Sequence, residues 1–111
     1  MEVYWKDRKT RELFESEKAL LGAGFDKKEA KKAFKAISNI ASVVSINQLP
    51  ANLRCHPIKE GKQFLYFTID VPSLGGGRGV HRIRFIPIGD EYDLSDLTTI
   101  TKVEILGIEK H

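Results

Sequence analysis

The chain has 111 residues, of which 41% are hydrophobic and 30% are charged, and its formal net charge is +3. This size and composition predict one soluble globular domain spanning residues 1–111, and no apolar run approaches the roughly 20 residues that a membrane span needs. The single cysteine, Cys55, excludes an internal disulfide and a zinc site of ordinary ligand spacing. Because the N-terminus has no signal-peptide pattern, we expect a cytoplasmic protein. We expect no cofactor.

Positive charge is concentrated in the middle of the chain. Residues 54–84 carry six cations and two carboxylates, a net charge of +4, whereas residues 85–111 carry two cations and six carboxylates, a net charge of −4. Such a split favours a basic face that contacts an anionic partner such as a nucleic acid. The alternative, in which these charges only alternate on solvated strands, stays open at this point.

The first 25 residues predict a strand followed by a helix. Val3, Tyr4 and Trp5 form the β-branched and aromatic run that is typical of a short strand. Asp7 then offers a helix N-cap. The apolar residues from Leu13 to Leu21 recur one and two turns apart, which predicts a single helix that ends at Gly22 and Gly24.

A second helix is predicted from Asp26 onward. Asp26 and Glu29 have the spacing of a capping box, and apolar residues then recur every three or four positions as far as Val44. Five lysines occupy the opposite side of this helix: Lys27, Lys28, Lys31, Lys32 and Lys35. They form either an ordinary solvated face or an additional electrostatic contact to a large RNA.

Beyond Pro50 the pattern changes from helix to strand. The three long strands predicted there are Phe64 to Val71, Val80 to Ile88, and Thr98 to Ile108. Pro87 indicates that the middle one ends there or lies at a sheet edge. Residues 72–79 lack the Gly-Lys-Ser/Thr ending of a phosphate loop, so we interpret them as a hairpin tip that presents Arg78. Helices followed by strands predict the α+β class with an antiparallel sheet.

Arg82 and Arg84 are the residues that most favour phosphate chemistry. Because they are two apart on a predicted strand, they share one face, while Ile83 and Phe85 face the core. A guanidinium group donates two parallel hydrogen bonds to phosphate and stays charged. Asp70 on the preceding strand offers an alternative, a cross-strand ion pair with one of the arginines. We therefore expect Arg82 to bind phosphate and Arg84 to have a mixed role.

His56 is the candidate proton-transfer residue. Since Pro57 follows it, His56 is expected to begin a strand or lie at a sheet edge. Imidazole can serve as a general acid or base near neutral pH, although a lone histidine is also typical of an ordinary polar surface. Lys59 is either a phosphate contact or without function, and Cys55 is expected to be a small buried hydrophobe.

Several stretches that follow one another along most of the chain resemble a single protein family. They are Tyr4-Trp5-Lys6-Asp7 with Thr10 and Leu13-Phe14-Glu15, Leu49-Pro50 with Asn52, Arg54-Cys55-His56-Pro57-Ile58-Lys59 with Gly61, Val80 to Phe85, and Val103 to His111. These stretches resemble the HigB/RelE-type toxins of bacterial toxin–antitoxin modules, also called plasmid-maintenance killer proteins.

The resemblance implies a RelE-like α+β fold, with a short N-terminal strand and two helices packed on a twisted antiparallel sheet. It also implies that the chain cleaves mRNA in the ribosomal A site without a metal ion, by attack of the 2′-hydroxyl on the adjacent phosphate. The partners implied are the ribosome, mRNA and a cognate antitoxin, expected to be a small helix-turn-helix protein encoded next to this one.

Residue roles follow from the resemblance and from the charge pattern. Arg82 is expected to stabilise the reacting phosphate with help from Arg54 and Lys59, and the acid and base are expected to be His56 and His111. The further RNA contacts expected are Arg54, Arg84, Lys62 and Arg78.

Two other functions fit the same residues. ParE relatives poison DNA gyrase by protein contact without cutting RNA, and a plain RNA-binding domain would use the basic face alone. Arginines and histidines on one open strand face favour the nuclease, because a gyrase poison needs no acid or base.

Overall fold

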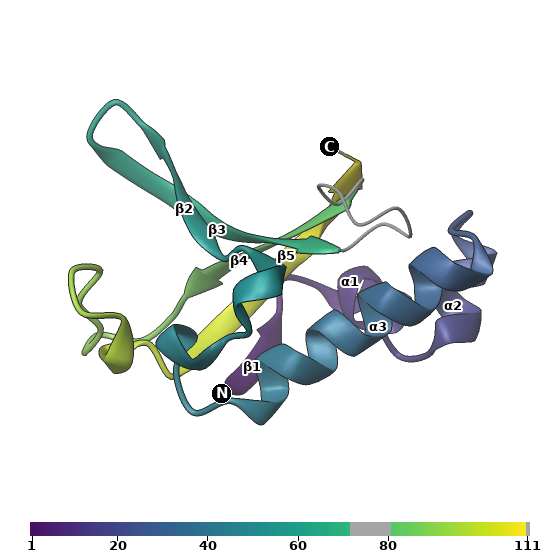
Figure 1. Cartoon of the computed structure of the whole chain (residues 1–111), viewed down its shortest axis with the longest axis horizontal. Coiled ribbons are helices and arrows are strands. Elements are labelled where there is room, and N and C mark those ends of the chain that lie inside the picture. Colours follow the sequence, from purple (N-terminus) through teal and green to yellow (C-terminus); the bar gives the residue numbers. More distant parts are fainter. Residues whose placement is uncertain (72–80, 111) are drawn as a thin grey trace.

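The computed structural model describes residues 1–71 and 81–110, and it has the predicted α+β class (Figure 1). Its strands are β1 (Glu2–Trp5), β2 (His56–Glu60), β3 (Gln63–Val71), β4 (His81–Pro87) and β5 (Lys102–Lys110). Its α-helices are α1 (Arg8–Leu13), α2 (Glu17–Gly22) and α3 (Lys27–Ser42). Short 3₁₀ turns follow α3 and precede β5: η1 (Ile46–Gln48), η2 (Ala51–Leu53) and η3 (Leu97–Thr99).

The five strands form one mixed sheet in the order β1-β5-β4-β3-β2. Pairs β2–β3, β3–β4 and β4–β5 are antiparallel as expected, but β1 pairs with β5 in parallel, from Glu2 opposite Lys102 to Trp5 opposite Ile105. The prediction of a wholly antiparallel sheet is therefore wrong at this edge. A parallel pair needs a long crossover connection, which nearly the whole chain provides here, so local sequence could not show which strand β1 would join.

The single helix predicted before Gly22 is two helices, so the described chain has three α-helices and not two. The Asp7 carboxylate caps α1 by accepting from the Thr10 N–H at 2.8 Å, and the Ser16 hydroxyl caps α2 by accepting from the Ala19 N–H at 3.1 Å. A serine that bonds a backbone N–H three residues on favours a new helix start. The break turns Phe14 inward, where it is 3% exposed and stacks on Trp5 at 5.7 Å between ring centroids.

Helix α3 begins where the capping box predicted. The Asp26 carboxylate accepts from the Glu29 N–H at 2.8 Å, and the Glu29 carboxylate accepts from the Asp26 N–H at 3.2 Å. The helix ends at Ser42, before the predicted Val44, which is 68% exposed. Its buried face is Ala30, Ala33, Ala36, Ile37 and Ile40. Within the described ranges no helix combines the length and the apolar character that a membrane crossing requires.

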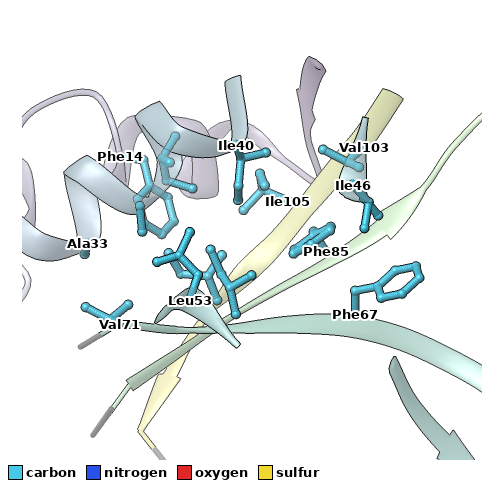
Figure 2. Packing of buried hydrophobic residues seen from close by; sticks show 14 of the residues in the cluster. Phe14, Ala33, Ile40, Ile46, Leu53, Phe67, Val71, Phe85, Val103 and Ile105 are labelled. Carbon is cyan, nitrogen blue, oxygen red and sulfur yellow. The ribbon is translucent and has the colours of Figure 1, made fainter. Parts of the chain in front are cut away.

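The helices cover one face of the sheet, and the core lies between them (Figure 2). Ile69, Ile83, Phe85, Val103 and Ile105 point to that side and are fully buried. Since side chains alternate along a strand, their neighbours in sequence are directed to the opposite face. The core thereby determines which polar residues meet on the face opposite the helices.

The ends of the strands differ in detail from the prediction. Strand β4 ends at Pro87 as expected, although it lies between β3 and β5 and not at an edge. Strand β5 begins at Lys102, later than the predicted Thr98, because the Asp96 carboxylate accepts from the Thr98 N–H at 3.1 Å and caps η3. Val80, the predicted first residue of the middle strand, lies outside the described residues.

Candidate functional site

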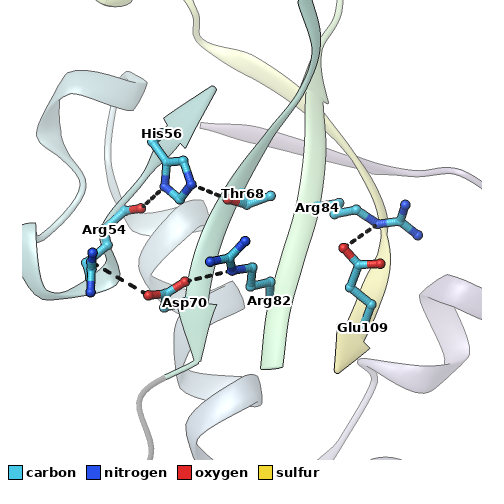
Figure 3. A network of polar contacts seen from close by, with 7 residues as sticks. All are labelled: Arg54, His56, Thr68, Asp70, Arg82, Arg84 and Glu109. Atoms are coloured by element: carbon cyan, nitrogen blue, oxygen red, sulfur yellow. Dashed lines mark hydrogen bonds and ion pairs between the residues drawn. The ribbon is translucent and has the colours of Figure 1, made fainter. Parts of the chain in front are cut away.

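The face of the sheet opposite the helices carries a group of arginines and carboxylates around one histidine. The members, which we call the arginine cluster, are Arg54, His56, Thr68, Asp70, Arg82, Arg84 and Glu109 (Figure 3). Strand register brings them together: His56 lies opposite Thr68, Thr68 opposite Arg84, and Asp70 opposite Arg82. The prediction that Arg82 and Arg84 share a face is confirmed, and His56 begins the edge strand β2 as expected.

Asp70 lies between two arginines. Its Oδ1 is 3.4 Å from Arg82 Nε, its Oδ2 is 3.8 Å from Arg54 Nε, and the residue is 4% exposed. The alternative of a cross-strand ion pair is therefore confirmed for Arg82, with Arg54 as a second partner. Burial of a carboxylate is costly unless cations compensate its charge, and these two guanidinium groups do so.

Arg54 reaches this carboxylate from outside the sheet. It follows η2 with φ 52° and ψ 49°, a left-handed conformation that non-glycine residues adopt only at some cost. The turn leads the chain into β2 and leaves the Arg54 side chain beside Asp70. Sequence reasoning expected Arg54 to contact RNA but did not predict this ion pair.

Arg84 is held by two neighbours. Its Nε lies 3.7 Å from Glu109 Oε1, and its guanidinium carbon lies 5.4 Å from the centroid of the Tyr66 ring. A guanidinium above an aromatic ring is stabilised by the ring's electron-rich face. These contacts support the structural part of the mixed role expected for Arg84. Neither Glu109 nor Tyr66 was among the predicted site residues; Glu109 was missed because the register of β5 cannot be read from the sequence.

His56 is fixed at both ring nitrogens. Its Nδ1 lies 2.8 Å from the Arg54 carbonyl oxygen, and its Nε2 lies 3.4 Å from Thr68 Oγ1. A carbonyl oxygen only accepts hydrogen bonds, so Nδ1 carries the proton and donates it. In the neutral ring, Nε2 then has a lone pair directed toward the Thr68 hydroxyl. Thr68 is 1% exposed, and sequence reasoning missed it because a strand threonine carries no distinctive signal.

The remaining predicted residues lie elsewhere. Lys59 pairs with Phe64 and, together with Lys62, lines a groove on the other side of β2 and β3, so neither lysine contacts the arginine cluster in the contacts observed. Arg78 and His111 lie outside the described residues. His81 faces the helices, where its Nδ1 lies 3.0 Å from Glu29 Oε2 and links β4 to the start of α3.

Residues 1–71 and 81–110 offer no evident site for metal ligation or for a reactive thiol. No three His, Cys, Asp or Glu side chains in these ranges are grouped in a way that could hold a metal ion. Cys55 is partly buried against the core, and this burial raises the pKa of its thiol to about 12. A thiol with so high a pKa is a poor nucleophile, and the expectation of a small buried hydrophobe agrees with its position.

Comparison with known proteins adds no identification. No family model matches the chain, and no curated protein matches it significantly. The resemblance to HigB/RelE-type toxins therefore stays a prediction. Three guanidinium groups can bind phosphate at the arginine cluster, and one oriented imidazole can move a proton.

Proposed function

We propose that this chain is the toxin of a toxin–antitoxin module and that it cleaves mRNA on the ribosome at the arginine cluster. The observation that carries the proposal is an imidazole held at both ring nitrogens, by the Arg54 carbonyl and by Thr68, on the same face of the sheet as the Asp70–Arg82 and Asp70–Arg54 ion pairs. Phosphodiester cleavage needs a proton acceptor and cations for the developing charge, and these residues could supply both.

In the proposed reaction, His56 Nε2 takes the proton of the ribose 2′-hydroxyl in place of its contact with Thr68. The 2′-oxygen then forms a bond to the adjacent phosphorus while the bond from phosphorus to the 5′-oxygen breaks. The 5′-oxygen leaves with a proton from a second acid, the role that the family resemblance gives to His111. Arg82 would stabilise the additional negative charge on the phosphorane. The products are a 2′,3′-cyclic phosphate and a 5′-hydroxyl end.

The pairing of the arginines favours a second candidate, a protein that binds RNA or another partner without cleaving it. Asp70 and Glu109 already compensate two of the three positive charges, so a phosphate must compete with carboxylates. A pure binder, however, has no use for an oriented imidazole. We therefore place the nuclease first and the non-nucleolytic binder second.

The test is to express the protein in translating cells and map new 5′ ends on mRNA. His56→Asn retains an N–H for the Arg54 carbonyl but has no proton acceptor, and we expect it to reduce cleavage about 10²–10⁴-fold. Arg82→Ala should reduce cleavage about 10²–10³-fold, the usual cost of losing one transition-state donor. The matched control is Arg11→Ala, which removes an exposed arginine of α1 and should leave cleavage unchanged.

The outcomes separate the candidates. Growth arrest without mRNA cuts but with failing DNA supercoiling would show a ParE-like protein binder and reject the nuclease. Cleavage that survives Arg82→Ala would reject the role of that arginine. RNA binding without cuts, lost in Arg82→Ala, would identify the plain RNA-binding domain.

A further inference from the structure

A second surface lies on the helix side of the sheet, beyond the end of α3. It is a groove of about 610 Å³ between the β2–β3 hairpin, η1 and the loop that contains η3. Its floor is apolar and includes Pro57, Phe64 and Phe67, with the two phenylalanine rings 5.0 Å apart. In Figure 1 the hairpin projects from the sheet on the same side as the loop that precedes β5. The groove shares only Arg54 with the arginine cluster.

The rim of this groove is partly apolar and exposed. Leu94 is 40% exposed and Leu97 is 37% exposed, and both line the groove on the wall opposite the hairpin. The volume falls within the ~300–1,000 Å³ of typical ligand sites. Large leucines at the edge of an apolar hollow are the usual mark of a surface that another molecule covers.

Charge on the groove is unevenly distributed. Arg54, Lys59 and Lys62 line the wall formed by the hairpin and the segment before it. The facing loop is acidic, and the carboxylates of Asp93 and Asp96 accept hydrogen bonds from Ser95 and Thr98 in local turns. Neither aspartate is among the described residues that line the groove. An occupant therefore meets cations along one wall, leucines along the other and phenylalanines below.

We infer that this groove binds an acidic amphipathic helix of a partner protein. Its leucine-like side chains fill the hollow between Phe64 and Leu94, and its glutamates or aspartates face Lys59 and Lys62. Addition of a strand to the free edge of β2 is disfavoured, because Pro57 has no N–H to donate and a bulge interrupts the register between Ile58 and Lys59. Binding must then come from side-chain burial, the mode by which helices bind grooves.

The probe for this inference is a fluorescein-labelled peptide of about 16 residues with leucines at positions i, i+3, i+4 and i+7 and glutamates on the flanks. Anisotropy titration of the full chain should give a Kd below about 100 µM, the affinity of a modest helix-in-groove contact. A peptide of the same leucine pattern with lysines in place of glutamates should bind at least about tenfold more weakly because of the cationic wall.

Matched variants locate the site. Leu94→Glu should weaken the acidic peptide at least about tenfold, whereas Leu21→Glu, at a leucine of α2 that is 43% exposed, should leave its Kd within about twofold. Lys62→Glu should weaken binding, and Lys18→Glu should not. Backbone amide shifts on binding should concentrate in β2, β3 and residues 94–97.

Several results would overturn the inference. They are no binding of the acidic peptide at millimolar concentration, equal binding of the lysine peptide, or an unchanged Kd in Leu94→Glu. Burial of the groove in a dimer of the free protein, or shifts in it caused by a short oligouridine and not by the peptide, would assign it to another occupant. The inference is independent of the proposed nuclease, because Leu94→Glu should leave mRNA cleavage intact.

Discussion

Replacing Asp70 by asparagine removes the carboxylate that lies between Arg54 and Arg82 while keeping the shape of the side chain. With an effective dielectric constant of about 20, the Coulomb attraction between the Asp70 carboxylate and the Arg82 guanidinium, 3.4 Å apart, is about 5 kcal/mol. The cost of desolvating the carboxylate offsets much of this attraction. Breaking a fully buried pair costs about 3–5 kcal/mol. The Arg82 and Arg54 side chains are 23% and 53% exposed, so water recovers part of that loss. We expect about 1–3 kcal/mol of destabilisation, or a Tm lower by about 5–12 °C.

Under the proposed function, the same substitution should strengthen RNA binding. The arginine cluster has three arginines and two carboxylates, so loss of Asp70 raises its charge from +1 to +2, with His56 neutral. One further phosphate contact should steepen the dependence of log K on log salt by about 0.7 for a single strand and raise affinity several-fold at low salt. The assays are thermal denaturation by circular dichroism and anisotropy of a labelled oligoribonucleotide across a salt series.

The control for net charge is Asp90→Asn, at an exposed position of the loop between β4 and β5. It should leave Tm and the salt slope nearly unchanged. If both variants bind RNA more tightly than wild type and by the same factor, the effect comes from net charge and not from the position of Asp70. If Asp70→Asn binds RNA more weakly, then the carboxylate orients the arginines for phosphate and does not mask them, and the reasoning above is refuted.

Three further predictions concern stability and reactivity. At pH 8 the raised pKa of Cys55, about 12, should slow its reaction with a disulfide reagent roughly 10³-fold relative to the guanidinium-unfolded chain, and equal rates would refute the burial. The Glu29 backbone N–H holds the pKa of Asp26 below its usual 3.8. The stabilising effect of this cap is therefore present above pH 3.8 and is lost as the pH falls through the lower pKa of the folded state. The difference in Tm between wild type and Asp26→Ala should thus be smaller at about pH 2 than at about pH 7. Phe85→Ala, at a fully buried ring, should cost about 3–5 kcal/mol in denaturant unfolding, whereas an exposed Tyr4→Ala should cost under about 1 kcal/mol.

Local signals in the sequence predicted the parts of the fold that depend on neighbouring residues. The capping box of Asp26 and Glu29 gave the start of α3, and the alternation around Ile83 gave the two faces of β4. Period-two alternation also placed Arg82 and Arg84 together and suggested Asp70 as a partner. These features need only the geometry of a single helix or a single hairpin.

The features that the sequence did not reveal depend on distant contacts. Nothing near β1 indicates that it pairs with β5. Arg54 and Lys59 both line the groove beside the β2–β3 hairpin, but Arg54, in its left-handed turn, also reaches Asp70, whereas Lys59 follows the bulge in β2. Glu109 entered the site through the register of β5, which depends on the irregularity between Arg84 and Phe85.

The paired state of the arginines bears directly on the proposed cleavage. A phosphodiester carries a single negative charge, the same as the carboxylate of Asp70, so exchanging one for the other at Arg82 yields little net electrostatic gain in the bound substrate. The phosphorane formed by 2′-hydroxyl attack carries a second negative charge and therefore competes with the carboxylate better than the substrate does. Only interactions that strengthen in the transition state accelerate the chemical step. An arginine compensated by a carboxylate is thus compatible with a weak RNA binder that is still a nuclease, and under the proposed function Asp70→Asn should tighten RNA binding more than it raises the rate of cleavage.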